Sequence, residues 1–90
     1  MIKFDLLPER LRGGVRDYIE EGNPPGGFLT AVIQNDLMGS LRRADGSSRK
    51  HLFDIGFFFY NEAPGNCWGT PEIMAAWIEQ GGMKHYAQGS

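Results

Sequence analysis

The sequence has a single cysteine, Cys67, and only two histidines, His51 and His85, among its 90 residues. One cysteine excludes an internal disulfide framework and a zinc site with several cysteine ligands, and it suits a reducing compartment. No histidine lies near Cys67 in the sequence, and the possible metal ligands His51, Asp54, Glu62 and Cys67 show no recognised spacing. We therefore expect no catalytic residues, no metal site and no cofactor.

A strong net charge and a long hydrophobic run are also missing. The formal net charge is −2 at pH 7, whereas a protein that neutralises nucleic-acid phosphates needs a basic face. Direct nucleic-acid binding is therefore not expected. The longest apolar run, residues 55–60, is far too short to cross a bilayer, and the first ten residues contain charges and a proline where a signal peptide needs an apolar core. We expect a soluble cytoplasmic protein that does not contact a membrane.

The composition is that of an ordinary globular protein, with 41% hydrophobic and 22% charged residues. A chain of this length forms one small domain and buries roughly 60–65% of its unfolded surface. We predict a single helical domain over residues 1–82, followed by a flexible tail over residues 83–90, because the end of the chain has no hydrophobic periodicity.

Hydrophobic periodicity and capping residues predict an all-α fold, a small bundle of about four helices. The first helix is expected to have Pro8 in its first turn and to stop at Gly22. The last has Thr70 as a candidate N-cap, Pro71 at the first helical position and Gly81 at its end. The predicted helices cover residues 8–21, 27–44, 48–61 and 71–80.

The third predicted helix contains FDIGFFFY, residues 53–60, which is apolar on nearly every side. Its aromatic residues would also suit a strand, but no second strand of similar strength is present to pair with it. A helix that is apolar all round is buried on all sides. We expect this segment either to fill the centre of the bundle or to join two protomers, with Phe57, Phe58 and Tyr60 as possible interface residues. The predicted core includes Tyr18, Phe28, Leu29, Val32, Trp68 and Trp77.

Asp36 falls on the apolar face of the second predicted helix, between Leu29 and Val32 in projection. An unpaired carboxylate on such a face is costly. It can be a buried strut with at least two partners within the chain, for example Arg43 or Arg16, or it can face a pocket and bind a cationic or hydroxylated ligand. We favour the strut, because polar residues that interrupt an apolar stripe are normally satisfied inside the fold.

The PPGG sequence, residues 24–27, leads into the second predicted helix. We interpret it as a tight turn between two helices. The alternative is an anion site, because free N–H groups at a helix N-terminus can receive an anion. Basic residues further along the chain could converge on it, although such a cluster is usually a solvated face. The candidate binding residues are Gly26, Gly27, Asp36, Arg42, Arg43 and Arg49.

Six short motifs in this sequence resemble a group of short proteins encoded by tailed phages and prophages of proteobacteria. They are Tyr-Ile, Pro-Gly-x-Phe-Leu, Asn-Asp-Leu, Arg-Ala-Asp, Tyr-Asn-x-Ala-Pro and Trp-Gly-x-Pro-Glu, and they span nearly the whole chain. The resemblance implies a small accessory phage protein in the host cytoplasm, and it assigns no role to any residue. The matching positions include Tyr18, Gly26, Phe28, Leu29, Asn35, Asp36, Arg43, Asp45, Tyr60, Asn61, Pro64, Trp68 and Glu72.

Two functional hypotheses follow, and an enzyme is the third and least favoured. The first is a non-enzymatic protein that binds a host protein, with inhibition of a host defence system, as by an anti-CRISPR protein, as one way of acting. The second is an oligomeric protein that sequesters a small nucleotide-like anion at the PPGG turn, which an excess of arginine over lysine would suit. A homodimer is compatible with both. A pocket lined by arginines would favour sequestration, and a flat apolar patch would favour a protein partner.

Overall fold

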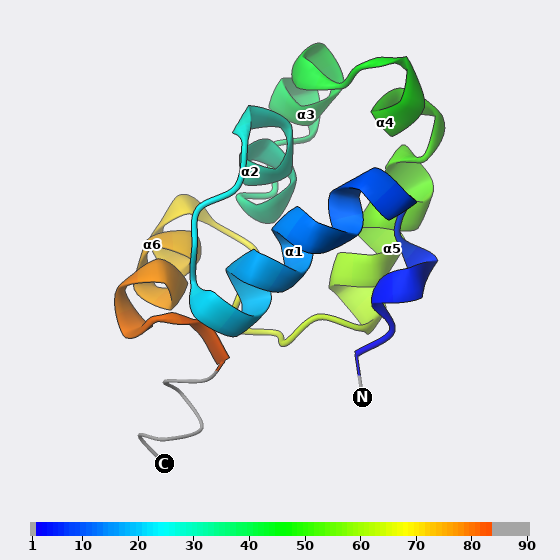
Figure 1. Ribbon diagram of the computed structural model, residues 1–90. Helices are drawn as coiled ribbons and strands as arrows, with labels where there is room; N and C mark the ends of the chain where they lie inside the picture. The colour runs from blue at the N-terminus through cyan, green and yellow to red at the C-terminus, as the bar shows by residue number, and fades with distance from the viewer. Residues whose placement is uncertain (1, 84–90) are drawn as a thin grey trace.

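The computed structural model describes residues 2–83, which form an all-α fold without strands. A short 3-10 helix, η1 (Phe4–Leu6), precedes six α-helices within these residues. The α-helices are α1 (Glu9–Glu21), α2 (Gly27–Ile33), α3 (Leu37–Arg43), α4 (Gly46–Lys50), α5 (Leu52–Asn61) and α6 (Pro71–Gln80). Helix α1 crosses the front of the molecule between α5 and α6, while α3 and α4 lie at the top (Figure 1).

The predicted tail, residues 83–90, lies outside the described residues apart from Met83. The side chain of Met83 is half-buried and packs against the hydrophobic core. Among the helices in the described part of the chain, none is both long enough and apolar enough to span a membrane.

The first and last predicted helices are confirmed. Helix α1 ends at Gly22, which adopts the left-handed conformation with a φ of 76°. Helix α6 begins after Thr70, whose hydroxyl oxygen accepts a hydrogen bond from the backbone N–H of Ile73 at 3.1 Å. Pro71 occupies the first helical position, where its missing N–H costs nothing. These two helices were predictable because their capping residues and hydrophobic periodicity agree.

The single helix predicted over residues 27–44 is wrong, because the chain forms two short helices there. Asn35 adopts a left-handed φ of 62° after the end of α2. Asp36 then starts α3 as its N-cap and accepts a hydrogen bond from the backbone N–H of Gly39 at 2.9 Å. Asparagine tolerates the left-handed conformation, and aspartate is among the best N-caps, so the Asn-Asp pair ends one helix and begins the next.

The helix predicted over residues 48–61 is also divided in two. Asp45 is the N-cap of α4 and accepts a hydrogen bond from the backbone N–H of Ser48 at 2.8 Å. Helices α4 and α5 meet at His51, whose backbone leaves the helical region with φ −107° and ψ 16°. The predicted bundle of about four helices is therefore corrected to six helices in the described residues, most of them short.

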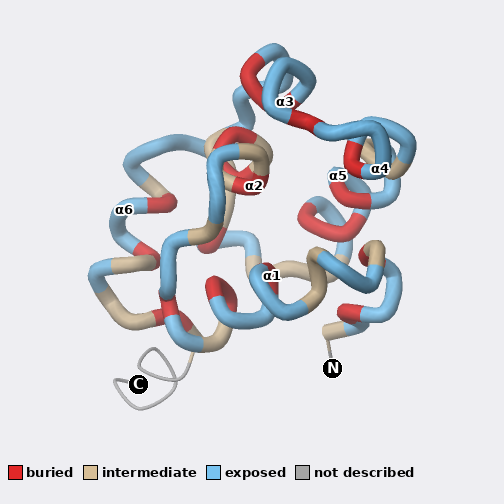
Figure 2. Tube along the Cα trace, turned by 45° about the horizontal axis from the view of Figure 1, so that its top comes forward, coloured by how far each residue is buried: buried red, intermediate tan, exposed pale blue. Residues whose placement is uncertain are grey.

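Every α-helix has buried residues, which are red in Figure 2. Tyr18 and Trp77 are among the fully buried members of one hydrophobic core. The hydroxyl of Tyr18 donates a hydrogen bond to the carbonyl oxygen of Cys67 at 2.6 Å. The indole N–H of Trp77 donates to the carbonyl oxygen of Tyr18 at 3.0 Å. These two bonds connect α1 to α6 and to the loop before α6. The predicted core is confirmed, since the same cluster includes Leu29, which is buried, and the half-buried residues Phe28, Val32 and Trp68.

Candidate functional site

Helix α5 is buried on one face only. Its inner face lies in the core and consists of Ile55, Phe58 and Phe59. Its outer face is in solvent and carries Phe53, Phe57 and Tyr60, which are 78, 51 and 75% exposed. The predicted place at the centre of the fold is therefore confirmed for the inner face alone, and the contact between two protomers stays a prediction for the outer face. The inner face fills the centre of the fold, and the outer face is free for contact with another molecule.

The prediction that Phe58 is a possible interface residue is wrong, because its side chain is fully buried. Its ring packs beside Phe4, with the centroids 5.7 Å apart, and edge-on against Phe59 at 5.4 Å. On the outer face, the rings of Phe53 and Phe57 stack on each other with centroids 6.0 Å apart. A large aromatic surface is thus kept together in solvent.

Helix α3 has its large apolar side chains outside and its small residues inside. Gly39 and Ser40 are its buried residues. Leu37, Met38 and Leu41 are 61, 71 and 39% exposed, and we call these three residues the α3 ridge. A helix on a protein surface normally buries its apolar face, so the reverse orientation makes the outer side of α3 a candidate contact surface. Most of α3 is exposed, as its pale blue colour in Figure 2 shows.

A groove of about 280 Å³ lies between α3 and α5, and we call it the α3–α5 groove. Its polar residues are Asn35, Asp36 and Ser40, which lie at the start and on the inner side of α3. The remaining surface is mainly apolar, and such a combination is typical of a site that receives an apolar group and orients it with a few polar contacts. Its large apolar lining residues are Val32, Leu37, Leu52, Phe59, Tyr60 and Trp68.

The prediction that Asp36 is a buried strut is wrong. Asp36 is exposed, and its one side-chain hydrogen bond within the described residues is the N-cap bond from Gly39. The chain leaves the helical path at Asn35, so Asp36 does not fall on the apolar face that an unbroken helix would have given it. Its structural role is to start α3, and the residue also lines the α3–α5 groove.

Replacing Asp36 with asparagine is expected to leave the free energy of unfolding nearly unchanged, whereas alanine should lower it by about 0.5–2 kcal/mol. The asparagine side chain can accept the same hydrogen bond from Gly39, and no buried charge is lost because Asp36 is exposed. Urea denaturation of the two variants measures the difference. Equal losses in both variants would contradict the capping role.

Three of the residues predicted to bind an anion do come together. Gly27, Asp36 and Arg43 line a hollow of about 330 Å³ beside the PPGG turn. The remaining candidates, Gly26, Arg42 and Arg49, are not among its lining residues. Arg43 donates a hydrogen bond to the carbonyl oxygen of Gly39 at 3.4 Å. An anion in this hollow would meet the Asp36 carboxylate as well as one guanidinium group, which does not favour a nucleotide-like ligand.

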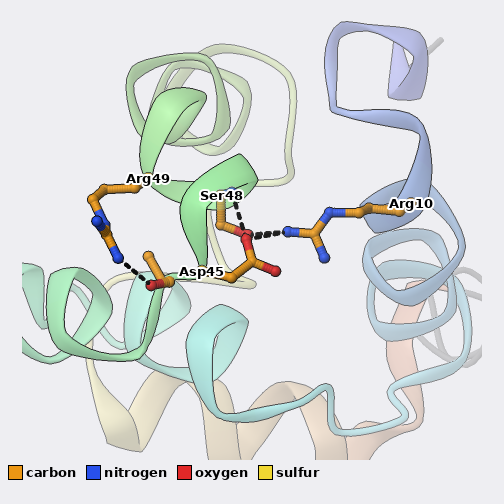
Figure 3. A network of polar contacts seen from close by, with 5 residues as sticks. Arg10, Asp45, Ser48 and Arg49 are labelled. Atoms are coloured by element: carbon orange, nitrogen blue, oxygen red, sulfur yellow. Dashed lines mark hydrogen bonds and ion pairs between the residues drawn. The ribbon is translucent and has the colours of Figure 1, made fainter.

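Arg49 belongs to a structural network (Figure 3). Its guanidinium donates to the carbonyl oxygen of Ala44 at 3.3 Å. On the other side of α4, Nη2 of Arg10 lies 2.6 Å from both Oδ1 of Asp45 and Oγ of Ser48. Hydrogen bonds from Ser48, together with the charge of Arg10, hold the pKa of the Asp45 carboxyl below its usual range. This network fastens α4 to α1 and to the end of α3, so Arg49 has a role in the fold.

Cys67 has no access to solvent, and burial raises the pKa of its thiol to about 12. It therefore stays protonated at neutral pH and is not a thiolate nucleophile. Nδ1 of His51 lies 3.5 Å from Oδ2 of Asp54, one helical turn away. Between residues 2 and 83, no three histidine, cysteine, aspartate or glutamate side chains are grouped so that they could hold a metal ion. His85 lies outside the described residues.

Comparisons of the chain with protein-family models, with curated proteins and with solved structures find no match. The candidate site is therefore interpreted from its own geometry. The sequence did not predict the α3 ridge, because one helix over residues 27–44 would place Leu37 beside Ile33 at the edge of the apolar face. The signal that could have found it is the Asn35-Asp36 pair, which separates α3 from α2 and allows it a different orientation.

Proposed function

We propose that this protein is a small non-enzymatic accessory protein that acts by binding a host protein through the α3 ridge and the adjoining α3–α5 groove. The observation that carries the proposal is the orientation of α3, which buries Gly39 and Ser40 and leaves Leu37, Met38 and Leu41 in solvent.

The energetics favour a protein partner over a small ligand at this surface. Covering a Leu or Met side chain completely contributes about 1.5–3 kcal/mol, and association costs about 4–15 kcal/mol in lost freedom of motion. The free energy gained by covering the three partly exposed side chains of the ridge is close to the lower end of that cost. The partner therefore also has to fill the groove. A protein segment with one apolar anchor for the groove and a flat apolar surface for the ridge meets both requirements. Met38 is suited to such contact because methionine adapts to irregular surfaces.

The phage context of the proposal comes from the sequence motifs. An accessory phage protein meets its partners in the cytoplasm of the host cell, and it changes a host process by occupying a surface that a host protein needs. Inhibition of a host defence system, such as a CRISPR system, is the form of this activity that we propose. Asn35, Asp36 and Trp68 belong to the shared motifs and also line the α3–α5 groove.

The proposal is tested by isolating the partner and then removing the ridge. The protein is immobilised, host proteins that it retains are identified by mass spectrometry, and the affinity of the purified partner is measured by calorimetry. Met38→Glu is expected to weaken binding about tenfold or more, the effect of losing one important interface residue. Met38 is 71% exposed, so the variant should remain folded.

Ala75→Glu is the matched control, because it adds the same charge to an exposed position on another helix, α6. It is expected to bind like the wild-type protein. In a host that carries the targeted defence system, the wild-type protein and Ala75→Glu should restore phage plating, whereas Met38→Glu should not. Unchanged affinity of Met38→Glu for the partner would overturn the proposal.

A further inference from the structure

The outer face of α5 is a second apolar surface, which adjoins the α3 ridge at Leu37 and the α3–α5 groove at Gly56 and Tyr60. It consists of Phe53, Gly56, Phe57 and Tyr60, and we call it the α5 stripe. Together with Leu37, Leu52 and Asn61, these residues line a shallow, mostly apolar depression of about 520 Å³. From the geometry of the stripe we infer that α5 packs antiparallel against α5 of a second copy of this chain, forming a symmetric dimer. This inference goes beyond the proposed host interaction and rests on separate observations, although a dimer would cover Gly56 and Tyr60, which also line the α3–α5 groove.

Gly56 is the first argument for a close neighbour. It lies in the interior of α5 and is exposed. Glycine at such a position weakens a helix by about 1 kcal/mol relative to alanine. A Cβ atom added to Gly56 would meet nothing within 4 Å, so the fold of one chain has no need for a glycine there. The missing side chain leaves space for a group from outside, at the centre of an aromatic surface.

The spacing of the four stripe residues along α5 indicates which group fills the space over Gly56. Its four positions are the same when read in either direction, with steps of three, one and three residues. When two copies of α5 run antiparallel about a two-fold axis between residues 56 and 57, each Phe57 ring lies over the Gly56 of the second copy. Each Phe53 then faces the Tyr60 of the second copy. A two-fold interface requires this self-complementarity, in which residue i contacts j and j contacts i.

The charges are compatible with the antiparallel arrangement. Asp54 is the one acidic residue of α5, and it lies beside His51, one turn earlier. At 1.5 Å per residue, antiparallel pairing separates the two Asp54 residues by roughly 7 Å along the helix axis, on opposite sides of the two-fold axis. A parallel arrangement would place these two like charges side by side and would align the two helix dipoles unfavourably.

The exposed aromatic area is that of a weak, reversible dimer. An aromatic side chain offers roughly 150–250 Å², so at the exposures of Phe53, Phe57 and Tyr60 the rings contribute on the order of 300–500 Å² per copy. Leu6 is 44% exposed and lies beside Phe53 and Phe57, where it extends this surface. Standard interfaces bury roughly 800 Å² per partner, so we expect a concentration-dependent dimer in reversible equilibrium with the monomer.

Sedimentation equilibrium over a series of protein concentrations tests the inference. The wild-type protein is expected to dimerise, and Phe57→Glu should weaken the dimer about 30-fold or more, as expected for a residue at the centre of an interface. Phe57 is 51% exposed, so its replacement leaves the core intact. Ala75→Glu carries the same added charge on α6 and should dimerise like the wild-type protein.

Gly56→Ala gives the sharper test. Alanine should raise the melting temperature of the dilute monomer, because it favours the helix. It should also weaken the dimer about tenfold or more, because the methyl group occupies the space that the Phe57 ring of the second copy needs. Gly13→Ala is the matched control, since Gly13 is also an exposed glycine within a helix with nothing within 4 Å of an added Cβ. It should stabilise the monomer equally and leave dimerisation unchanged.

A wild-type protein that stays monomeric at all concentrations would overturn the inference, as would a Gly56→Ala variant that dimerises like the wild type. If the protein is monomeric and Phe57→Glu abolishes binding to a host protein, the α5 stripe is a binding site for that host protein. The dimer is refuted in that case as well. Failure of the host interaction is recognised separately, because Met38 lies on the α3 ridge and does not line the depression over α5.

Discussion

Replacing Trp77 with alanine is expected to lower the free energy of unfolding by about 3–5 kcal/mol. The side chain is only 1% exposed and sits where α6 meets α1. Its removal leaves a large cavity and deprives the carbonyl oxygen of Tyr18 of the donor that lies 3.0 Å away. A domain of this size has a total stability of roughly 5–13 kcal/mol. The loss therefore amounts to a large part of the stability of the protein.

Urea denaturation followed by far-UV circular dichroism measures this loss. Tryptophan fluorescence is less suitable, because the substitution removes one of the two tryptophans of the chain. Trp77→Phe keeps most of the ring volume and loses the N–H donor, so it should cost less than alanine. Trp68→Ala is a comparison at a half-buried position and should also cost less. A loss of less than about 1 kcal/mol for Trp77→Ala would contradict its central position in the core.

Helices α1 and α6 were predictable from the sequence because their capping residues and their hydrophobic periodicity indicate the same helix bounds. Thr70, Pro71 and Gly81 define both ends of α6 by capping chemistry alone, and the apolar residues between them face one core. Gly22 ends α1 in the same way. In both helices the hydrophobic periodicity continues without interruption between the caps, so no competing signal was present.

The middle of the chain was less predictable because its periodicity continues across two breaks. Phe28, Leu29, Val32 and Ile33 fit one face of a helical wheel, and this fit concealed the left-handed conformation of Asn35. A residue in that conformation changes the direction of the chain, whatever the hydrophobic pattern on either side. The capping preferences of Asn and Asp were the better guide here, and the interpretation of Asp36 as a buried strut failed with the assumed helix.

The candidate site was predicted in part. The sequence indicated that α5 could contact another molecule, and it included Phe57 and Tyr60 among the interface residues. It could not separate them from Phe58, because in a continuous apolar run the buried face depends on how the neighbouring helices pack. Whether an apolar helix is covered on one side or on all sides depends on the number and length of the helices around it. With α3 and α4 as short as they are, the outer face of α5 remains uncovered.

The second large effect is expected where the ends of α1 and α6 meet. Gly22 and Gly82 both have left-handed backbones, with φ of 76° and 80°. A methyl group on Gly82 would lie 2.5 Å from the backbone nitrogen of Gly22 and 2.7 Å from the carbonyl oxygen of Glu20. The two chain segments touch through their backbones, and at this point only glycine allows the approach.

Gly82→Ala is therefore expected to lower the free energy of unfolding by about 2–5 kcal/mol. The left-handed conformation costs an alanine about 1–2 kcal/mol, and the displacement of backbone atoms adds about 1–3 kcal/mol as in other overpacked sites. Gly13→Ala makes the same chemical change within α1, where an added Cβ meets nothing within 4 Å. It should raise the stability by up to about 1 kcal/mol. Urea denaturation compares the two variants. The same added methyl group is expected to lower the free energy of unfolding at Gly82 and to raise it at Gly13. A small loss or a gain for Gly82→Ala would show that the ends of α1 and α6 are not in contact in solution.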